Sequence, residues 1–234
     1  MKKPNEIKQF SDWSREWKDG RNKPDAEKIL CLWKNKPIPH GWERNTWKGE
    51  VGYRKSGDGK GEQCTERQLF NGGEDGFNLV FSDPKTNATY RLQAIYHNMP
   101  LANQRKGQVL ADVFGFLEMG KSIRPVFIEI KVTANDPWFA LVENLQQIRL
   151  ARAGARNIQD FVRKKKERQV DRGVWGLILA PKCYYEKHSA NLAECKPLLD
   201  ALKQKTRARV AFGISDYLSS GKIEIKDSNW LNNG

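Results

Sequence analysis

The sequence predicts an α/β protein with a mixed central sheet flanked by helices. Apolar runs rich in Val, Ile and Phe, which are typical of buried strands, occupy residues 109–117, 126–132 and 174–180. Helical patterns follow the second and third of these runs, and such alternation is typical of parallel strand pairs. The first two runs are joined by the polar segment 118–125, which indicates a β-hairpin with a longer loop.

Shorter signals complete the expected order of elements. Strands are predicted at residues 77–81, 88–96, 209–214 and 222–225. The main helix is expected from Pro137 to about Ala153, because Asp136 can cap it and proline suits its first position. Its predicted buried stripe is Trp138, Leu141, Val142, Leu145 and Ile148. A basic helix over 157–169 and an amphipathic helix over 190–205 follow.

The hairpin carries charged residues where a buried strand should have none. Asp112 lies in the first run, and Glu129 and Lys131 lie in the second. Residues two apart in a strand share a face, so Glu129 and Lys131 should point to the same side. Two carboxylates can hold a hard divalent cation, and a lysine can place positive charge beside a phosphate. An ordinary same-face ion pair on a half-exposed strand would explain Glu129 and Lys131 but not their convergence with Asp112.

Asp112 followed by Glu129-Ile130-Lys131 on adjacent strands, and then by a helix, resembles the PD-(D/E)XK nuclease superfamily. The resemblance covers roughly residues 62–181 and departs from the pattern at Ala111, where many members have proline. It implies a restriction-endonuclease-like core from about residue 61 to 226. It also implies that Asp112, Glu129 and the carbonyl of Ile130 bind Mg²⁺, for which Mn²⁺ substitutes.

Two further site residues follow only from that resemblance. Many relatives carry an additional acid on a helix before the first core strand, and Glu66 fits this place, with Glu62 as the substitute. Some relatives place a glutamine of the main helix near the metal, and Gln146 or Gln147 could match it; Gln146 is taken as the candidate. The tyrosine that one subgroup has four residues later is absent here.

Composition favours a polyanionic partner. The net charge is +13, and no apolar run reaches the roughly 18 residues of a membrane helix, so nucleic acid is favoured over a membrane. Residues 149–172 hold nine basic and three acidic residues. The predicted nucleic-acid contacts are Arg105, Lys106, Arg149, Arg152, Arg156, Arg163, Lys164, Lys165 and Lys166.

The chain divides by composition into two parts. Residues 1–60 form a basic N-terminal extension or subdomain with five of the eight tryptophans, and residues 61–234 form the nuclease-like domain. The tryptophans could stack on bases, but packing against the main domain is favoured. The four cysteines lack metal-site spacing and read as reduced thiols.

The function expected from the sequence is Mg²⁺-dependent endonucleolytic hydrolysis of DNA by a cytoplasmic enzyme. Asp112, Glu129, Lys131, Glu66 and Gln146 form the expected catalytic set. The rival is a non-catalytic nucleic-acid-binding module on the same fold, and a regulatory partner of a larger complex is a third reading. The sequence leaves open RNA as substrate and a homodimer as the assembly.

Overall fold

The computed structural model describes nine ranges of the chain: residues 78–83, 88–102, 109–119, 122–132, 136–153, 169–170, 173–206, 208–215 and 222–228. The expected N-terminal extension, residues 1–60, lies outside these ranges. Within them no helix is both long enough and apolar enough to cross a bilayer.

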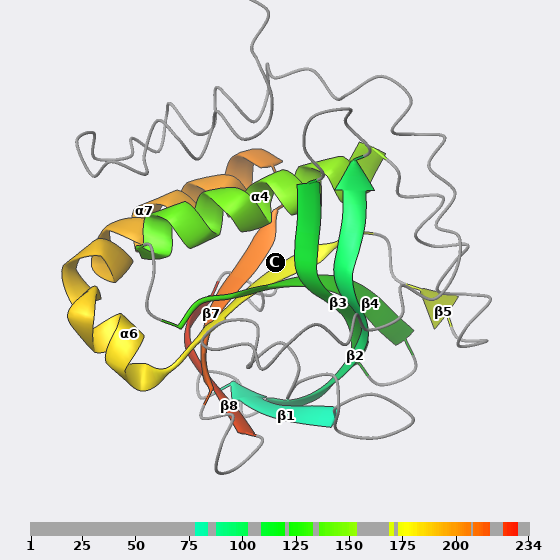
Figure 1. Ribbon diagram of the computed structural model, residues 1–234, viewed down its shortest axis with the longest axis horizontal. Helices are drawn as coiled ribbons and strands as arrows, with labels where there is room; N and C mark the ends of the chain where they lie inside the picture. The colour runs from blue at the N-terminus through cyan, green and yellow to red at the C-terminus, as the bar shows by residue number, and fades with distance from the viewer. Residues whose placement is uncertain are drawn as a thin grey trace, which may run out of the picture.

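A mixed sheet forms the centre of the fold. Its strands are β1 (Asn78–Asp83), β2 (Ala88–Ala102), β3 (Val109–Met119), β4 (Ser122–Ile130), β5 (Gln169–Val170), β6 (Trp175–Ala180), β7 (Arg209–Ser215) and β8 (Lys222–Ser228). Their order is β3-β2-β1-β8-β7-β6-β4-β5, and β3 also pairs with β4. That additional pairing brings the first strand of the order back to the far side, so the sheet curls (Figure 1). The predicted α/β class and mixed sheet are confirmed.

Helices α4 (Pro137–Ala153) and α7 (Ser189–Thr206) lie side by side across the sheet (Figure 1). The predicted start of α4 is confirmed, because the Asp136 Oδ1 accepts a hydrogen bond of 2.8 Å from the Phe139 N–H. At the other end of α4, the Arg152 guanidinium donates to the carbonyl of Thr206 at 2.5 Å. Arg152 therefore satisfies a backbone carbonyl at the C-terminal end of α7, where a cation is favoured.

Four points of secondary structure differ from expectation, and one is that β2 continues to Ala102 instead of ending at residue 96. The hairpin is tighter than expected, because β3 continues to Met119 and β4 begins at Ser122. Gln169 lies in β5 rather than at the end of a basic helix. The short helix α6 (Lys182–Lys187) was not predicted; it begins directly after Pro181 at the end of β6 and is too short to show a clear period.

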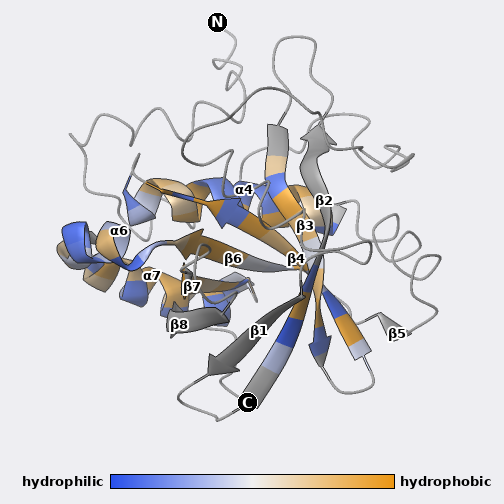
Figure 2. Ribbon diagram, turned by 60° about the horizontal axis from the view of Figure 1, so that its bottom comes forward, coloured by the Kyte–Doolittle hydropathy of each residue, from blue (hydrophilic) through white to orange (hydrophobic). Residues whose placement is uncertain are grey.

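The core lies between the helices and the sheet. The strands β4 and β6 are hydrophobic along much of their length (Figure 2). Buried residues from α4, α6, α7, β6 and β7 form one cluster, which includes Leu141, Leu145, Ile178, Tyr185, Leu198 and Phe212. Helix α4 is buried beyond its predicted stripe, since Phe139, Leu150 and Ala151 are buried as well. Besides β4 and β6, helix α4 contacts α7, β2 and β3.

Strand β4 pairs with β3 along one edge and with β6 along the other, and the two pairings end at different residues. Antiparallel pairing with β3 ends at Val113 and Ile128, while parallel pairing with β6 runs from Val126 to Ile130. On the N-terminal side of Val113, residues 109–111 of β3 pair with β2 only. The two strands of the hairpin thus separate at a fork, and Asp112 and Glu129 are the first residues beyond it.

Gly176 allows α4 to approach β6 closely. A Cβ atom on Gly176 would lie 1.7 Å from the Asn144 Oδ1 and 2.8 Å from the Ile148 Cδ1. The Ile148 methyl is the flexible end of its side chain and can move. The Asn144 amide is short and is held by hydrogen bonds to Phe127 and Gln147, so it has little room to yield.

We predict that Gly176→Ala lowers the free energy of unfolding by roughly 1–3 kcal/mol, the usual cost of overpacking a core. Urea denaturation of the variant measures this loss. The control is the same substitution in an Asn144→Ala background, where the clashing amide is gone and the added methyl group should cost much less. An equal loss in both backgrounds would show that Asn144 is not the obstacle.

Candidate active site

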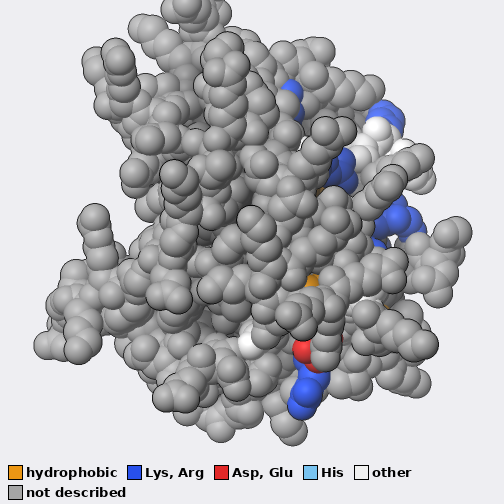
Figure 3. Space-filling model, turned by 90° about the vertical axis from the view of Figure 1, so that its right-hand side faces the viewer, with side chains coloured by type: hydrophobic (Ala, Val, Ile, Leu, Met, Phe, Trp, Pro, Cys, Tyr) orange, Lys and Arg blue, Asp and Glu red, His pale blue; other side chains and the backbone are white. Residues whose placement is uncertain are grey.

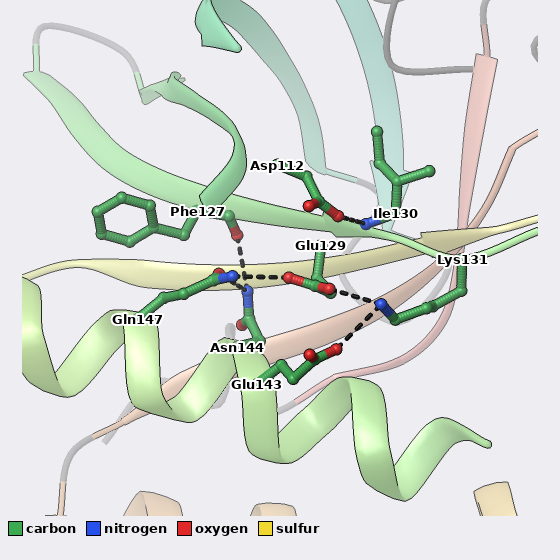
Figure 4. Close-up of polar contacts among 8 residues, drawn as sticks. All are labelled: Asp112, Phe127, Glu129, Ile130, Lys131, Glu143, Asn144 and Gln147. Atoms are coloured by element: carbon green, nitrogen blue, oxygen red, sulfur yellow. Dashed lines mark hydrogen bonds and ion pairs between the residues drawn. The ribbon is translucent and has the colours of Figure 1, made fainter. Parts of the chain in front are cut away.

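Asp112 bridges the fork between β3 and β4. Its Oδ2 accepts a hydrogen bond of 2.9 Å from the backbone N–H of Ile130. The bond gives the Ile130 N–H an acceptor at a position where β3 and β4 no longer pair, since their last pair is Val113 and Ile128. It also fixes the carboxylate next to the strand that carries Glu129 and Lys131 (Figure 4).

Glu129 and Lys131 point to the same side of the chain, as predicted, and they contact α4 rather than solvent. The Lys131 Nζ lies 2.6 Å from the Glu129 Oε1 and 3.0 Å from the Glu143 Oε2 of α4 (Figure 4). Both Glu129 and Lys131 are 4% exposed. The pair is therefore not the half-exposed surface pair of the alternative explanation. Buried charges are retained only with good partners, and this cluster supplies them.

The cluster shifts the pKa values of two members. Burial alone would lower the pKa of Lys131, but the charges of Glu129, Glu143 and Asp112 raise it above its usual value, so the ammonium keeps its proton. Burial, followed by the charge of Glu129, raises the pKa of Glu143 to about 8 although Lys131 opposes the shift. Burial and the neighbouring charge of Glu129 thus favour the protonated form of Glu143.

The second oxygen of Glu129 is engaged by a glutamine. Gln147 Nε2 donates to the Glu129 Oε2 at 2.6 Å, and the Asn144 Nδ2 donates to the Gln147 Oε1 at 3.2 Å. Gln147, rather than the candidate Gln146, therefore contacts Glu129. Gln146 is also buried, but its Nε2 has no hydrogen-bond partner within the described ranges.

Asp112 and Glu129 offer a donor set that fits Mg²⁺. Carboxylate oxygens are the hard ligands that this ion prefers, and one or two of them suffice when water and phosphate complete the shell. An ionised carboxylate can accept about four hydrogen bonds, so the contacts of Glu129 leave acceptor capacity. Within the described ranges no group of three or more His, Cys, Asp or Glu residues is arranged around a metal position. The expected fourth donor, Glu66, lies outside those ranges.

The predicted nucleic-acid contacts separate into two groups. Arg149 is 9% exposed on α4, and Arg152 is bonded to Thr206, so the fold itself uses both side chains. The other predicted contacts lie outside the described residues; they are Arg105, Lys106, Arg156, Arg163, Lys164, Lys165 and Lys166. On the face shown in Figure 3, basic side chains of the described residues are visible in several places, with acidic ones beside the lowest of them.

Comparisons with protein-family models, with curated proteins and with solved structures found no match to this chain.

Sequence reasoning missed Glu143 and Asn144 as members of the site. The predicted buried stripe of the helix includes neither residue, and a single apolar stripe implies that the opposite face is solvated. One signal was available. Glu143 and Gln147 are four residues apart, so they share a helix face, and that face also carries Asn144 three residues before Gln147.

We predict that burial of Glu143 makes the stability of the EDTA-treated protein depend on pH. A carboxyl whose pKa rises from 4.5 to about 8 on folding stabilises the protein fully below pH 4.5, and this stabilisation is lost as pH rises toward 8. Between pH 5 and 8.5 the wild type should therefore lose about 1–2 kcal/mol relative to Glu143→Gln. This figure is less than the full shift implies, because the side chain is 30% exposed.

Urea titrations of both proteins at several pH values measure this difference, and subtraction removes the contribution of titrating groups that do not interact with Glu143. A difference that stays constant from pH 5 to 8.5 would contradict the raised pKa of Glu143.

Proposed function

We propose that this protein is a Mg²⁺-dependent endonuclease that hydrolyses DNA phosphodiester bonds, on a restriction-endonuclease-like core. The observation that carries the proposal is the convergence of Asp112, Glu129 and Lys131 at the fork of the hairpin. The contacts of Asp112 with Ile130 and of Lys131 with Glu129 bring a half-buried acid beside a buried Glu129–Lys131 pair. Isolated structural roles would not require two acids and a lysine at one such place.

Asp112, Glu129 and the carbonyl of Ile130 would hold the ion, which supplies a polarised phosphoryl oxygen and an acidified water when it is bound. Lys131 would orient the attacking water and offset the negative charge that develops on the phosphate. Its raised pKa favours this role over proton abstraction, because a protonated amine cannot act as a base. Gln147 holds the Glu129 carboxylate in place.

The rival proposal is a nucleic-acid-binding module without catalysis, since the net charge of +13 supports either function. A binding module requires exposed basic groups and has no chemical need for a buried Glu129–Lys131 pair beside a second acid. This difference favours the nuclease. Binding without cleavage, in the presence of Mg²⁺ or Mn²⁺, would favour the rival.

The first prediction from this function concerns the ion. Mg²⁺ and Mn²⁺ should bind the wild type and fail to bind the Asp112→Ala, Glu129→Ala double variant, because both carboxylate ligands are gone. Titration calorimetry measures the binding. The matched control removes two exposed acids of the C-terminal half, Glu186→Ala with Asp200→Ala, and should bind as the wild type does. Equal binding by all three proteins would remove the proposed site.

The second prediction concerns Lys131. Lys131→Met should lower the single-turnover rate of supercoiled-plasmid nicking with Mn²⁺ by roughly 10²–10³-fold, the usual cost of removing one electrostatic donor. The control is Lys182→Met, which removes an exposed lysine that lies 3.6 Å from the exposed Glu186. Circular dichroism checks that both variants are folded. Near-wild-type nicking by Lys131→Met would exclude this lysine from the reaction.

A further inference from the structure

Asn144 occupies a buried position that an apolar side chain could fill more simply. It is 0% exposed, and its Oδ1 has no hydrogen-bond partner within the described ranges. An unpaired buried oxygen is costly, and the same amide also excludes any side chain from Gly176. The two N–H groups of Asn144 must therefore do something that offsets these costs.

Both N–H groups of Asn144 are used. Nδ2 donates to the backbone carbonyl of Phe127 at 3.1 Å and to the Oε1 of Gln147 at 3.2 Å (Figure 4). The carbonyl of Phe127 can only accept, so the group of Asn144 that faces it must be the NH₂. The same NH₂ meets Gln147, so Gln147 must present its oxygen to Asn144.

The orientation of Gln147 then follows. With Oε1 turned to Asn144, Nε2 is turned to Glu129, where it donates to Oε2 at 2.6 Å. The hydrogen bonds form one connected path. Asn144 of α4 donates to the Phe127 carbonyl of β4 and to Gln147, and Gln147 donates to Glu129 of β4. If Asn144 lost its donors, the Gln147 Oε1 would lose this partner, and the amide would keep only its bond to Glu129 to hold it in place.

We infer that Asn144 is a positioning residue, which sets the amide of Gln147 so that Glu129 is held for the metal, and that Gly176 is required to admit it. The inference rests on the proposed function for its metal-binding consequence. Its geometric part, the orientation of Gln147, stands without that function. Partners of this kind, which orient a metal ligand, typically contribute tenfold to hundredfold to metal affinity.

The test is a double-mutant cycle on Asn144→Leu and Gln147→Leu, read as Mn²⁺ affinity by calorimetry. Leucine keeps the branched shape of asparagine and is one heavy atom shorter than glutamine, and it removes the hydrogen bonds of both. Asn144→Leu should weaken Mn²⁺ binding roughly tenfold to hundredfold, and the double variant should be no weaker than Gln147→Leu alone, because Asn144 acts through Gln147. An additive loss, or no loss in Asn144→Leu, would overturn the inference.

A control separates positioning from stability. Tyr185→Phe removes a buried hydroxyl that lies 3.0 Å from the carbonyl of Ile178 and 3.2 Å from that of Gly213. This hydroxyl takes no part in the hydrogen bonds that connect Asn144, Gln147 and Glu129. The substitution should lower stability and leave Mn²⁺ affinity unchanged. If it weakened Mn²⁺ binding as much as Asn144→Leu does, the effect of Asn144 would be one of stability alone.

A second readout separates failure of this inference from failure of the proposed function. In ¹⁵N-labelled protein with EDTA, the side-chain amide signals of Gln147 should shift on Asn144→Leu and on Glu129→Gln. Shifts in a protein that binds no Mn²⁺ would leave the positioning intact and remove the metal site. Signals that do not respond to Asn144→Leu would overturn the positioning itself.

Discussion

Lys131 lies between two carboxylates where water has little access, and the surrounding elements supply a partner for each charge. The 2.6 Å contact with Glu129 requires β4 to be extended through residue 131, and the 3.0 Å contact with Glu143 requires α4 to cross at this level of the sheet. The backbone N–H of Lys131 is bonded to the carbonyl of Leu179, which ties the end of β4 to β6. Removing one charge would leave the others buried and unpaired, at a cost of several kcal/mol.

Charge balance explains why three acids can gather around one lysine. The raised pKa of Glu143 favours its protonated form, which lessens the negative charge around Lys131. Asp112 is relieved by a different donor, the N–H of Ile130. A cation that approached this place would find one carboxylate held by backbone and one held by Gln147, both of them oriented in advance. Such preorganisation is what favours binding or catalysis over a flexible arrangement.

The parts of the fold that depend on local chemistry could be predicted from the sequence. The pair Asp136-Pro137 specifies where α4 starts, and the two-residue period of a strand places Glu129 and Lys131 on one side. The partners across elements could not be predicted. Whether Glu143 or Gln146 reaches β4 depends on how α4 is rotated over the sheet, and that rotation is set by Gly176 and Asn144, which meet across 32 positions of sequence. The fork also depends on pairing with β6, which an isolated hairpin pattern does not contain.

Contacts between elements also limit what the net charge can predict about nucleic-acid binding. Arg149 and Arg152 belong to the basic excess of residues 149–172, yet one is nearly covered and the other is bonded to the end of α7. A guanidinium committed to a backbone carbonyl is not free to neutralise a phosphate, so these two residues should add little to the salt dependence of binding. If DNA is the substrate, the electrostatic contribution must come mainly from other basic residues. The run Arg163-Lys164-Lys165-Lys166 carries four charges without an intervening acid, which makes it the strongest remaining candidate.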